Sequence, residues 1–299
     1  MLAFLFTRFD LSALAPTGEV SHLPWVAAGL VTLVAAIVLS TLRWQRVLRA
    51  LDLAEPLPPL LSHCFAGLFV ANFLPSTIGG DVLRVARLSA GNGKRPASFA
   101  SVVLERLTGF LVLPVITLAA LLSHPALLHL GTATGLALTL SLVTLSALTA
   151  ILVLAASPRL GGRLAGNANW LRFVGAVHLG VDRIRRHPAA AASVMLTALA
   201  YQLTVVLVAW IATRALGIDV GWAAVMAFIP VVAMAQAIPV SVNGLGLREG
   251  ALVLLLRPLG VPDHQAIALG LLLYGMNVVV SLIGAPAFAI GGRPARVAA

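Results

Sequence analysis

The stretch NFLPSTIGGDVLRVARL, residues 72–88, places Asp81, Arg84 and Arg87 directly behind a proline and two glycines, in the middle of an apolar chain. Of the 299 residues, 60% are hydrophobic and only 10% are charged, and the mean hydropathy is +1.01. A soluble domain usually carries about 25% charged residues. Apolar runs of about 20 residues, long enough to cross a hydrocarbon core about 30 Å thick, recur along the chain. The composition therefore predicts an all-α polytopic membrane protein with about five to seven spans.

The net charge of +10 comes mainly from arginines that lie between the apolar runs. In a membrane protein this pattern indicates positively charged cytoplasmic loops rather than a nucleic-acid surface, so we expect no nucleic-acid partner. Cys64 is the single cysteine, which excludes an intrachain disulfide. The seven histidines show no metal-ligand spacing. We therefore expect neither a metal nor a cofactor.

Basic segments divide the chain and orient its spans. A first span is expected at residues 23–42, and Arg43, Arg46 and Arg49 after it place its C-terminal end in the cytoplasm. The expected organisation is a short N-terminal leader at 1–22, a first membrane half at 23–156 with a hairpin around 57–90, a basic cytoplasmic or interfacial segment at 157–188, a second membrane half at 189–292 with a hairpin around 222–257, and a basic tail at 293–299. Further spans are expected at 97–122, 128–156, 189–212 and 265–290. Apolar residues at helical spacing within 157–188 predict an interfacial amphipathic helix on anionic lipid.

Two short apolar segments are interrupted by proline and glycine. The first, residues 57–74, stops at Pro75, and a helix can restart from Asp81. Because the basic residues on both sides are expected in the cytoplasm, this unit should enter and leave the membrane on the same face. The second, residues 222–238, ends at Pro239 and should enter from the opposite face if the C-terminal tail is cytoplasmic. Both are therefore predicted to be re-entrant helical hairpins.

The two interruptions share a sequence pattern. PSTIGGDVLR (75–84) and PVSVNGLGLR (239–248) align without a gap as P-x4-G-x3-R, so that Arg84 matches Arg248. The alternative is a chance match in a chain rich in Gly, Leu and Arg. Since the loop charges place the two copies in hairpins that enter from opposite faces, we predict an inverted repeat, and transporters bind their substrates at such breaks. The residues expected to form the breaks are Pro75, Gly79, Gly80, Pro239, Gly244 and Gly246.

Arg84 and Arg248 are the leading candidates for binding an anion. Each lies within one or two turns of a restarting helix, where free backbone N–H groups and the positive end of the helix dipole favour negative charge. A guanidinium group adds a planar, permanently charged fork that fits phosphate or carboxylate. The alternative is that each arginine is paired structurally with a neighbouring carboxylate, Asp81 and Glu249 respectively.

Another pair of charges falls inside an apolar span. Glu105 and Arg106 lie about nine residues, or roughly 14 Å, beyond an expected helix start near Pro96, which is close to the membrane midplane. Ionisable groups at this depth are energetically unfavourable and are usually functional. Adjacent residues point about 100° apart on a helix, so each should find its partner on a different helix. For Glu105 the expected partner is Arg84 or Arg248.

Several uncharged polar residues also fall within apolar segments. Such residues form either interhelical hydrogen bonds or contacts with a ligand. They are Asn72, Gln202, Gln236, Asn243, Tyr274 and Asn277.

Four motifs, in order, resemble the signature of the lysylphosphatidylglycerol synthase transmembrane-region family, also called flippase-like membrane proteins. They are RWQRVL (43–48), NFLPSTIGGDVLRVARL (72–88), ASVVLERLTGFLVL (100–113) and PVSVNGLGLREGAL (239–252). The resemblance implies a multi-pass protein of the cytoplasmic (inner) membrane that translocates an anionic lipid or lipid-linked intermediate of phospholipid, glycolipid or polyprenyl-phosphate type. It also implies that Asp81, Arg84, Glu105, Arg106, Asn243, Arg248 and Glu249 are functional residues, and we add Asn72 as a substrate contact.

The chain departs from many relatives at both ends. No soluble aminoacyltransferase domain follows residue 299, so we expect lipid aminoacylation to be absent. The apolar segment that precedes the first span in many relatives is also shortened.

Two other functions fit a protein of this kind. A non-transporting accessory subunit of envelope lipid or glycan synthesis would hold a lipid in the same pockets. An intramembrane enzyme fits less well, because GGD at 79–81 lacks the glycine that the GxGD motif of intramembrane aspartyl proteases requires at Ile78. A second aspartate at membrane depth, needed for a catalytic dyad, is also missing. We therefore expect a transporter and not an enzyme.

Overall fold

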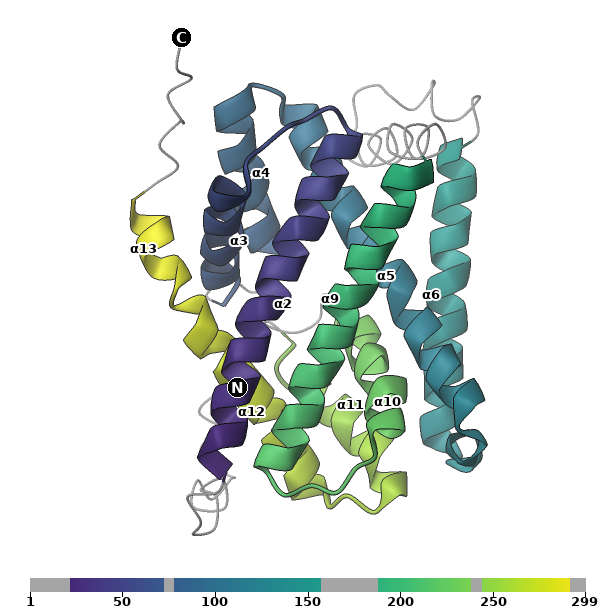
Figure 1. The fold of residues 1–299 in the computed structure, drawn as a ribbon. Coiled ribbons are helices and arrows are strands. Elements are labelled where there is room, and N and C mark those ends of the chain that lie inside the picture. Colours follow the sequence, from purple (N-terminus) through teal and green to yellow (C-terminus); the bar gives the residue numbers. More distant parts are fainter. Residues whose placement is uncertain (1–21, 73–77, 157–187, 238–243, 291–299) are drawn as a thin grey trace.

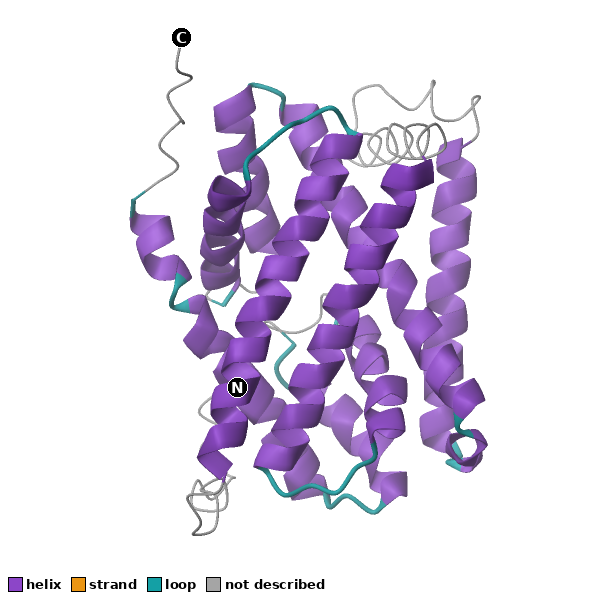
Figure 2. Ribbon diagram, in the orientation of Figure 1, coloured by secondary structure: helices purple, strands orange, loops and turns teal. Residues whose placement is uncertain are grey.

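The structure, a computed structural model, describes residues 22–72, 78–156, 188–237 and 244–290. These residues form helices joined by short loops, and no strand occurs among them (Figures 1 and 2). The α-helices are α2 (Leu23–Ala50), α3 (Leu57–Ala71), α4 (Ile78–Asn92), α5 (Arg95–Ser123), α6 (Thr132–Ala156), α9 (Pro188–Ala215), α10 (Trp222–Ala235), α11 (Leu247–Leu256), α12 (Asp263–Ser281) and α13 (Gly284–Ala289). Short 3-10 helices lie at η3 (Pro125–His129) and η4 (Arg257–Leu259). The all-α prediction is confirmed.

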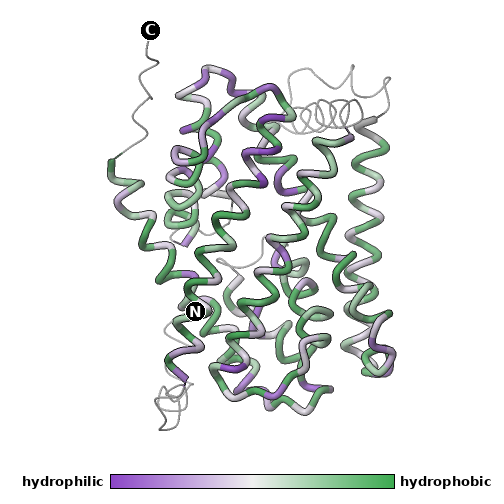
Figure 3. The backbone as a smooth tube through the Cα atoms, in the orientation of Figure 1, coloured by the Kyte–Doolittle hydropathy of each residue, from purple (hydrophilic) through white to green (hydrophobic). Residues whose placement is uncertain are grey.

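Five of these helices are long and apolar enough to cross a membrane, namely α2, α5, α6, α9 and α12. A span of 28 residues, such as α2 or α9, is about 42 Å long at 1.5 Å per residue, more than the hydrocarbon core requires. Figure 3 shows hydrophobic residues along most of α6 and hydrophilic residues gathered at the ends of the bundle. The protein is therefore a multi-pass membrane protein.

The shorter apolar helices lie in different halves of the molecule. Figure 1 shows α3 and α4 in the upper half of the view, and α10 and α11 in the lower half. At 15 and 14 residues, α3 and α10 are only about 22 Å long, too short to span the hydrocarbon core. This arrangement agrees with hairpins that reach part of the way through the membrane. Their re-entrant character and their relation as an inverted repeat stay predictions.

The main apolar core surrounds α10. Ala227, Phe228 and Val231 are fully buried there, and α10 packs against α5, α6, α9 and α11. The Thr117 hydroxyl of α5 donates a hydrogen bond to the Ala227 carbonyl at 3.0 Å. A helix that is apolar all round is typical of a protein core or of a membrane span, and the length and contacts of α10 place it in the core.

Several helix boundaries differ from the sequence-based expectation, and three of these differences affect the fold around the site. The first span does not stop at residue 42, because α2 continues to Ala50. The last expected span, 265–290, is interrupted after Ser281 and continues as the separate helix α13. In the first hairpin the helix restarts at Ile78 and not at Asp81.

The two glycines of the first hairpin therefore have a different role from the one expected. Gly79 and Gly80 lie in the first turn of α4 rather than in the break. A methyl group on Gly80 would collide with the carbonyl oxygen of Gly67 in α3. Glycine at this position thus allows the backbones of α3 and α4 to approach closely. Some expectations lie outside the described residues. They concern the break residues Pro75 and Pro239, the candidate Asn243 and the interfacial helix expected within 157–188.

Candidate functional site

A cluster of charged side chains lies between α2, α4 and α5. It consists of Arg43 from α2, Asp81 and Arg84 from α4, and Glu105 and Arg106 from α5. We call these five residues the arginine cluster. Three separate helices build it, so its geometry depends on their packing.

Glu105 lies at the centre of the arginine cluster and is only 2% exposed. Arg43 Nη2 donates a hydrogen bond to its Oε1 atom, and Arg84 Nη1 donates to Oε2 at 3.1 Å. The Ser40 hydroxyl adds a donor to Oε1 at 3.3 Å. Both oxygens of the carboxylate are therefore satisfied, as a buried charge requires. Of the two partners expected for Glu105 from the sequence, the structure shows Arg84.

Asp81 forms the outer part of the arginine cluster. Its Oδ2 accepts a hydrogen bond from Arg106 Nε at 2.7 Å, and its Oδ1 lies 3.4 Å from Arg84 Nη1. Arg84 therefore bridges the two carboxylates. The prediction that Glu105 and Arg106 each find a partner on a helix other than α5 is confirmed. Arg106 pairs with α4, and Glu105 pairs with both α4 and α2.

Aromatic rings stack on two of the guanidinium groups. The Trp44 ring centre lies 4.2 Å from Arg84 Cζ, and the Tyr201 ring centre lies 4.7 Å from Arg43 Cζ. Trp44 is itself held in place, because its Nε1 donates to Ser101 Oγ at 3.0 Å. Cation–π contacts of this kind orient a guanidinium plane and partly replace its lost hydration.

The arginine cluster contains more positive than negative charge. Three guanidinium groups against two carboxylates leave one net positive charge. Arg43 and Arg84 are 5% and 8% exposed. Four of their nitrogens, Arg43 Nε and Nη1 and Arg84 Nε and Nη2, are buried and have no hydrogen-bond partner among the described residues. Such a site has the charge and the free donors to accept an anion with several oxygens, such as a phosphate.

Arg248 and Glu249, at the start of α11, belong to other surroundings. Glu249 Oε2 accepts a hydrogen bond from the backbone N–H of Gly246 at 2.6 Å and so caps the first turn of α11. Arg248 Nη1 donates to the carbonyl oxygen of Gly270 in α12 at 3.4 Å, and its Cζ lies 5.7 Å from the Tyr274 ring centre. These contacts involve α11 and α12, whereas the arginine cluster involves α2, α4 and α5.

The remaining predicted site residues fall into two groups. Gly244 and Gly246 lie in the turn before α11 with φ angles of +81° and +84°, a conformation that glycine adopts without strain. Asn72, at the end of α3, donates to Ser281 Oγ in α12 at 2.7 Å. Gln202 of α9 likewise donates to the carbonyl oxygen of Gly109 in α5 at 3.2 Å. Both of these side chains form the interhelical hydrogen bonds that were one of the two expectations.

Sequence reasoning missed Arg43, Trp44 and Tyr201. The charge pattern assigns Arg43 to the cytoplasmic residues that follow the first span, but this side chain lies within α2 and is buried. The spacing of apolar residues after Arg43 could have indicated its position within the helix. Trp44, Val47 and Leu48 continue the apolar pattern of the span past Arg43, which indicates that the helix does not end there.

Within the described parts of the chain, no group of three or more His, Cys, Asp or Glu side chains is arranged to hold a metal ion. The arginine cluster instead offers donors and positive charge. These are the properties that the binding of an anion requires.

Comparison with known proteins places the chain in one family. No curated protein and no solved structure matches it. The family model described as the lysylphosphatidylglycerol synthase TM region matches residues 1–284, nearly the whole chain. The charged motifs that build the arginine cluster all lie within this match. The protein therefore belongs to the lysylphosphatidylglycerol synthase TM region family.

Proposed function

We propose that this protein translocates an anionic lipid, or an anionic lipid-linked intermediate, between the leaflets of the cytoplasmic membrane. The substrate would be of phospholipid, glycolipid or polyprenyl-phosphate type. No covalent chemistry is required, since the protein has only to bind the headgroup and provide it with a polar route.

The observation that carries the proposal is the charge balance of the arginine cluster. One net positive charge lies within the helices of a membrane protein, and four guanidinium nitrogens have no hydrogen-bond partner in the described parts of the chain. A charge in that environment is unfavourable unless a counter-ion completes it. A lipid phosphate supplies one negative charge and several acceptor oxygens, and its acyl chains can stay in the surrounding bilayer.

Arg43 and Arg84 are the residues that we expect to contact the phosphate. Glu105 holds their guanidinium groups through one nitrogen each, which leaves the other nitrogens available. The aromatic rings of Trp44 and Tyr201 keep the two groups oriented. A preorganised pair of this kind binds a phosphate with little loss of side-chain entropy.

Arg84→Gln provides the test. It leaves Arg43 with Glu105 and Arg106 with Asp81, so the remaining charges are balanced and the fold should persist. In vesicles that contain a fluorescent phosphatidylglycerol, the unmodified protein should make the inner-leaflet probe accessible to an external quencher. The variant should be slower by at least about tenfold, since a charge-assisted hydrogen bond contributes about 1.5–3 kcal/mol.

The matched control is Arg257→Gln, because the side chain of Arg257 is 75% exposed and lies 3.8 Å from Asp263. This variant should transport at the rate of the unmodified protein. Equal transport by Arg84→Gln and Arg257→Gln would contradict the role of the arginine cluster. Binding of phosphatidylglycerol without any movement would instead favour the accessory-subunit function.

A further inference from the structure

One face of α12 carries polar groups from Gly270 to the end of the helix at Ser281. Gly270, Tyr274, Asn277 and Ser281 are spaced four, three and four residues apart, and at about 100° per residue they lie on the same side of the helix. We call this side the polar face of α12. Its backbone and side-chain groups offer carbonyl, hydroxyl and amide atoms within an apolar span.

The polar face connects the two hairpins. At one end, the Gly270 carbonyl oxygen accepts a hydrogen bond from Arg248 of α11. At the other end, Ser281 Oγ accepts a hydrogen bond from Asn72, the residue that ends α3. Figure 1 shows α12 rising from the lower half, beside α11, toward the upper half, where α3 lies. A group moving along this face would pass from one interrupted segment to the other.

Two buried oxygens along this face have no donor among the described residues. Asn277 Oδ1 lies on the polar face itself, between Tyr274 and Ser281. Glu249 Oε1 packs against its start, since a methyl group on Gly270 would lie 2.8 Å from that oxygen. Buried acceptors are normally paired, and water or a bound polar molecule supplies the donor where the protein does not.

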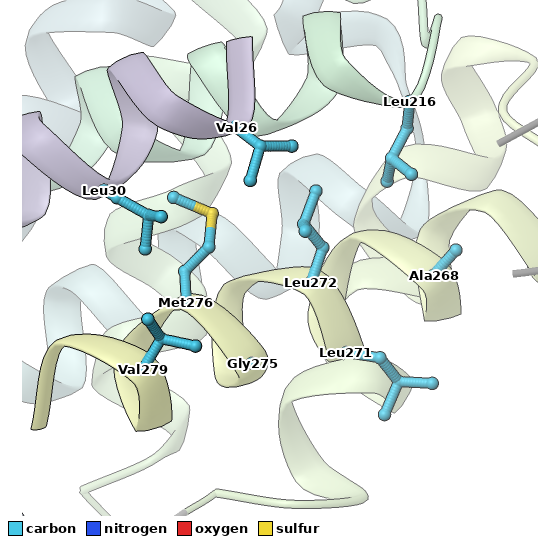
Figure 4. Close-up of a pocket in the computed structure, with 9 residues that line it drawn as sticks. All are labelled: Val26, Leu30, Leu216, Ala268, Leu271, Leu272, Gly275, Met276 and Val279. Atoms are coloured by element: carbon cyan, nitrogen blue, oxygen red, sulfur yellow. The ribbon is translucent and has the colours of Figure 1, made fainter. Parts of the chain in front are cut away.

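The opposite face of α12 has a different character. Leu271, Gly275 and Val279 line a groove of about 360 Å³ with Val26 and Leu30 of α2, and every side chain that lines it is apolar (Figure 4). Val279 is 53% exposed on this side. In the membrane such a face contacts acyl chains and excludes water. The same helix thus has a polar face and, on its opposite side, an apolar face with which the polar face can be compared.

We propose that the polar face of α12 lines a water-filled route along which the lipid headgroup passes between the two hairpins, with Asn277 as a positioning residue midway along it. That a lipid headgroup is the molecule that passes along the route depends on the proposed function. The existence of the route rests on the contacts of α12. At its two ends the polar face contacts Asn72 of the first hairpin and Arg248 of the second.

Cysteine accessibility tests the route without any lipid transport. In a Cys64→Ser background, Tyr274→Cys and Asn277→Cys are compared with Leu271→Cys and Val279→Cys on the groove side. A membrane-impermeant methanethiosulfonate reagent is applied to proteoliposomes. A thiol in water ionises and reacts, whereas a thiol in apolar surroundings stays protonated, so the first two positions should react at least about tenfold faster than the last two.

Total reactivity after solubilisation in denaturing detergent shows that each cysteine is present, and two positions on each face guard against one misfolded variant. Equal rates on both faces would overturn the route. Fast labelling of the polar face in a protein that moves no lipid would support the route and refute the proposed function. Lipid movement with both faces unreactive would refute the route alone.

Discussion

Glu105 is the residue on which the arginine cluster depends. It accepts hydrogen bonds from Arg43, Arg84 and Ser40, and these donors come from two different helices. Removing its charge would leave the buried guanidinium group of Arg43 without a counter-ion, and Arg84 would keep only Asp81, at 3.4 Å. A buried charge that loses its partner destabilises a protein much more strongly than a surface charge does.

The first prediction at this scale concerns Glu105→Gln. The substitution keeps the side-chain size but raises the net charge of the arginine cluster by one, and we expect the free energy of unfolding to fall by about 3–5 kcal/mol. The measurement is thermal unfolding in detergent, followed by tryptophan fluorescence. Asp219→Asn is the matched control. The side chain of Asp219 is 97% exposed, so its ion pair with Arg214 should contribute at most about 1 kcal/mol to the free energy of unfolding. Similar melting temperatures for the two variants would show that Glu105 does not hold the cluster together.

At the scale of elements, the contact between α3 and α4 positions half of the arginine cluster. Asp81 and Arg84 lie one and two turns into α4. The first turn of α4 packs against α3 where Gly80 of α4 meets the backbone of Gly67 in α3. The Gly80 site has no room for a side chain because its neighbour is a carbonyl oxygen rather than a movable side chain. The two glycines therefore determine where the guanidinium of Arg84 lies.

Gly80→Ala should separate α3 from α4 and shift Arg84 relative to Glu105. Overpacking of this kind destabilises by about 1–3 kcal/mol, and we also expect slower lipid movement in the vesicle assay. Gly91→Ala, on the same helix, has nothing within 4 Å of the added methyl group. That control should be neutral or stabilise the helix by up to about 1 kcal/mol, because alanine is the better helix former. A Gly80→Ala protein as stable and active as Gly91→Ala would contradict this account of the α3–α4 contact.

At the scale of the whole molecule, the last two helices join the halves. α12 packs against α11 of the second hairpin, while α13 packs against α3 of the first. Arg87 of α4 secures α13 by donating to the carbonyl oxygens of Ala287 and Phe288 at 2.9 and 3.1 Å. The interruption after Ser281 lets the chain change direction and contact both hairpins.

The prediction for the whole molecule is the opposite orientation of the two hairpins. In a Cys64→Ser background, Thr77→Cys should react with an impermeant thiol reagent from the cytoplasmic side and Ser241→Cys from the outer side. This follows from the positive-inside distribution of arginine and from the repeated P-x4-G-x3-R pattern. Right-side-out and inverted membrane vesicles give the two accessibilities separately. Labelling of both positions from one face would exclude an inverted repeat.

The sequence by itself determined the class of the protein and most of its helices. Length and hydropathy are sufficient for this, because a lipid environment permits few structures other than apolar helices of about 20 residues. The motif order also led to the family, and the depth of Glu105 and Arg106 within a span indicated that both would seek partners on other helices. These inferences depend on local pattern alone.

Only the tertiary structure decided which charges meet. Arg43 looks like a loop charge in the sequence, yet α2 continues past it and places it against Glu105 of α5. Arg84 and Arg248 match in the repeat, but Arg84 contacts α5 while Arg248 contacts α12. The pairing of buried charges depends on how three helices far apart in the sequence pack together, and a pattern of residues along one chain contains no such distance.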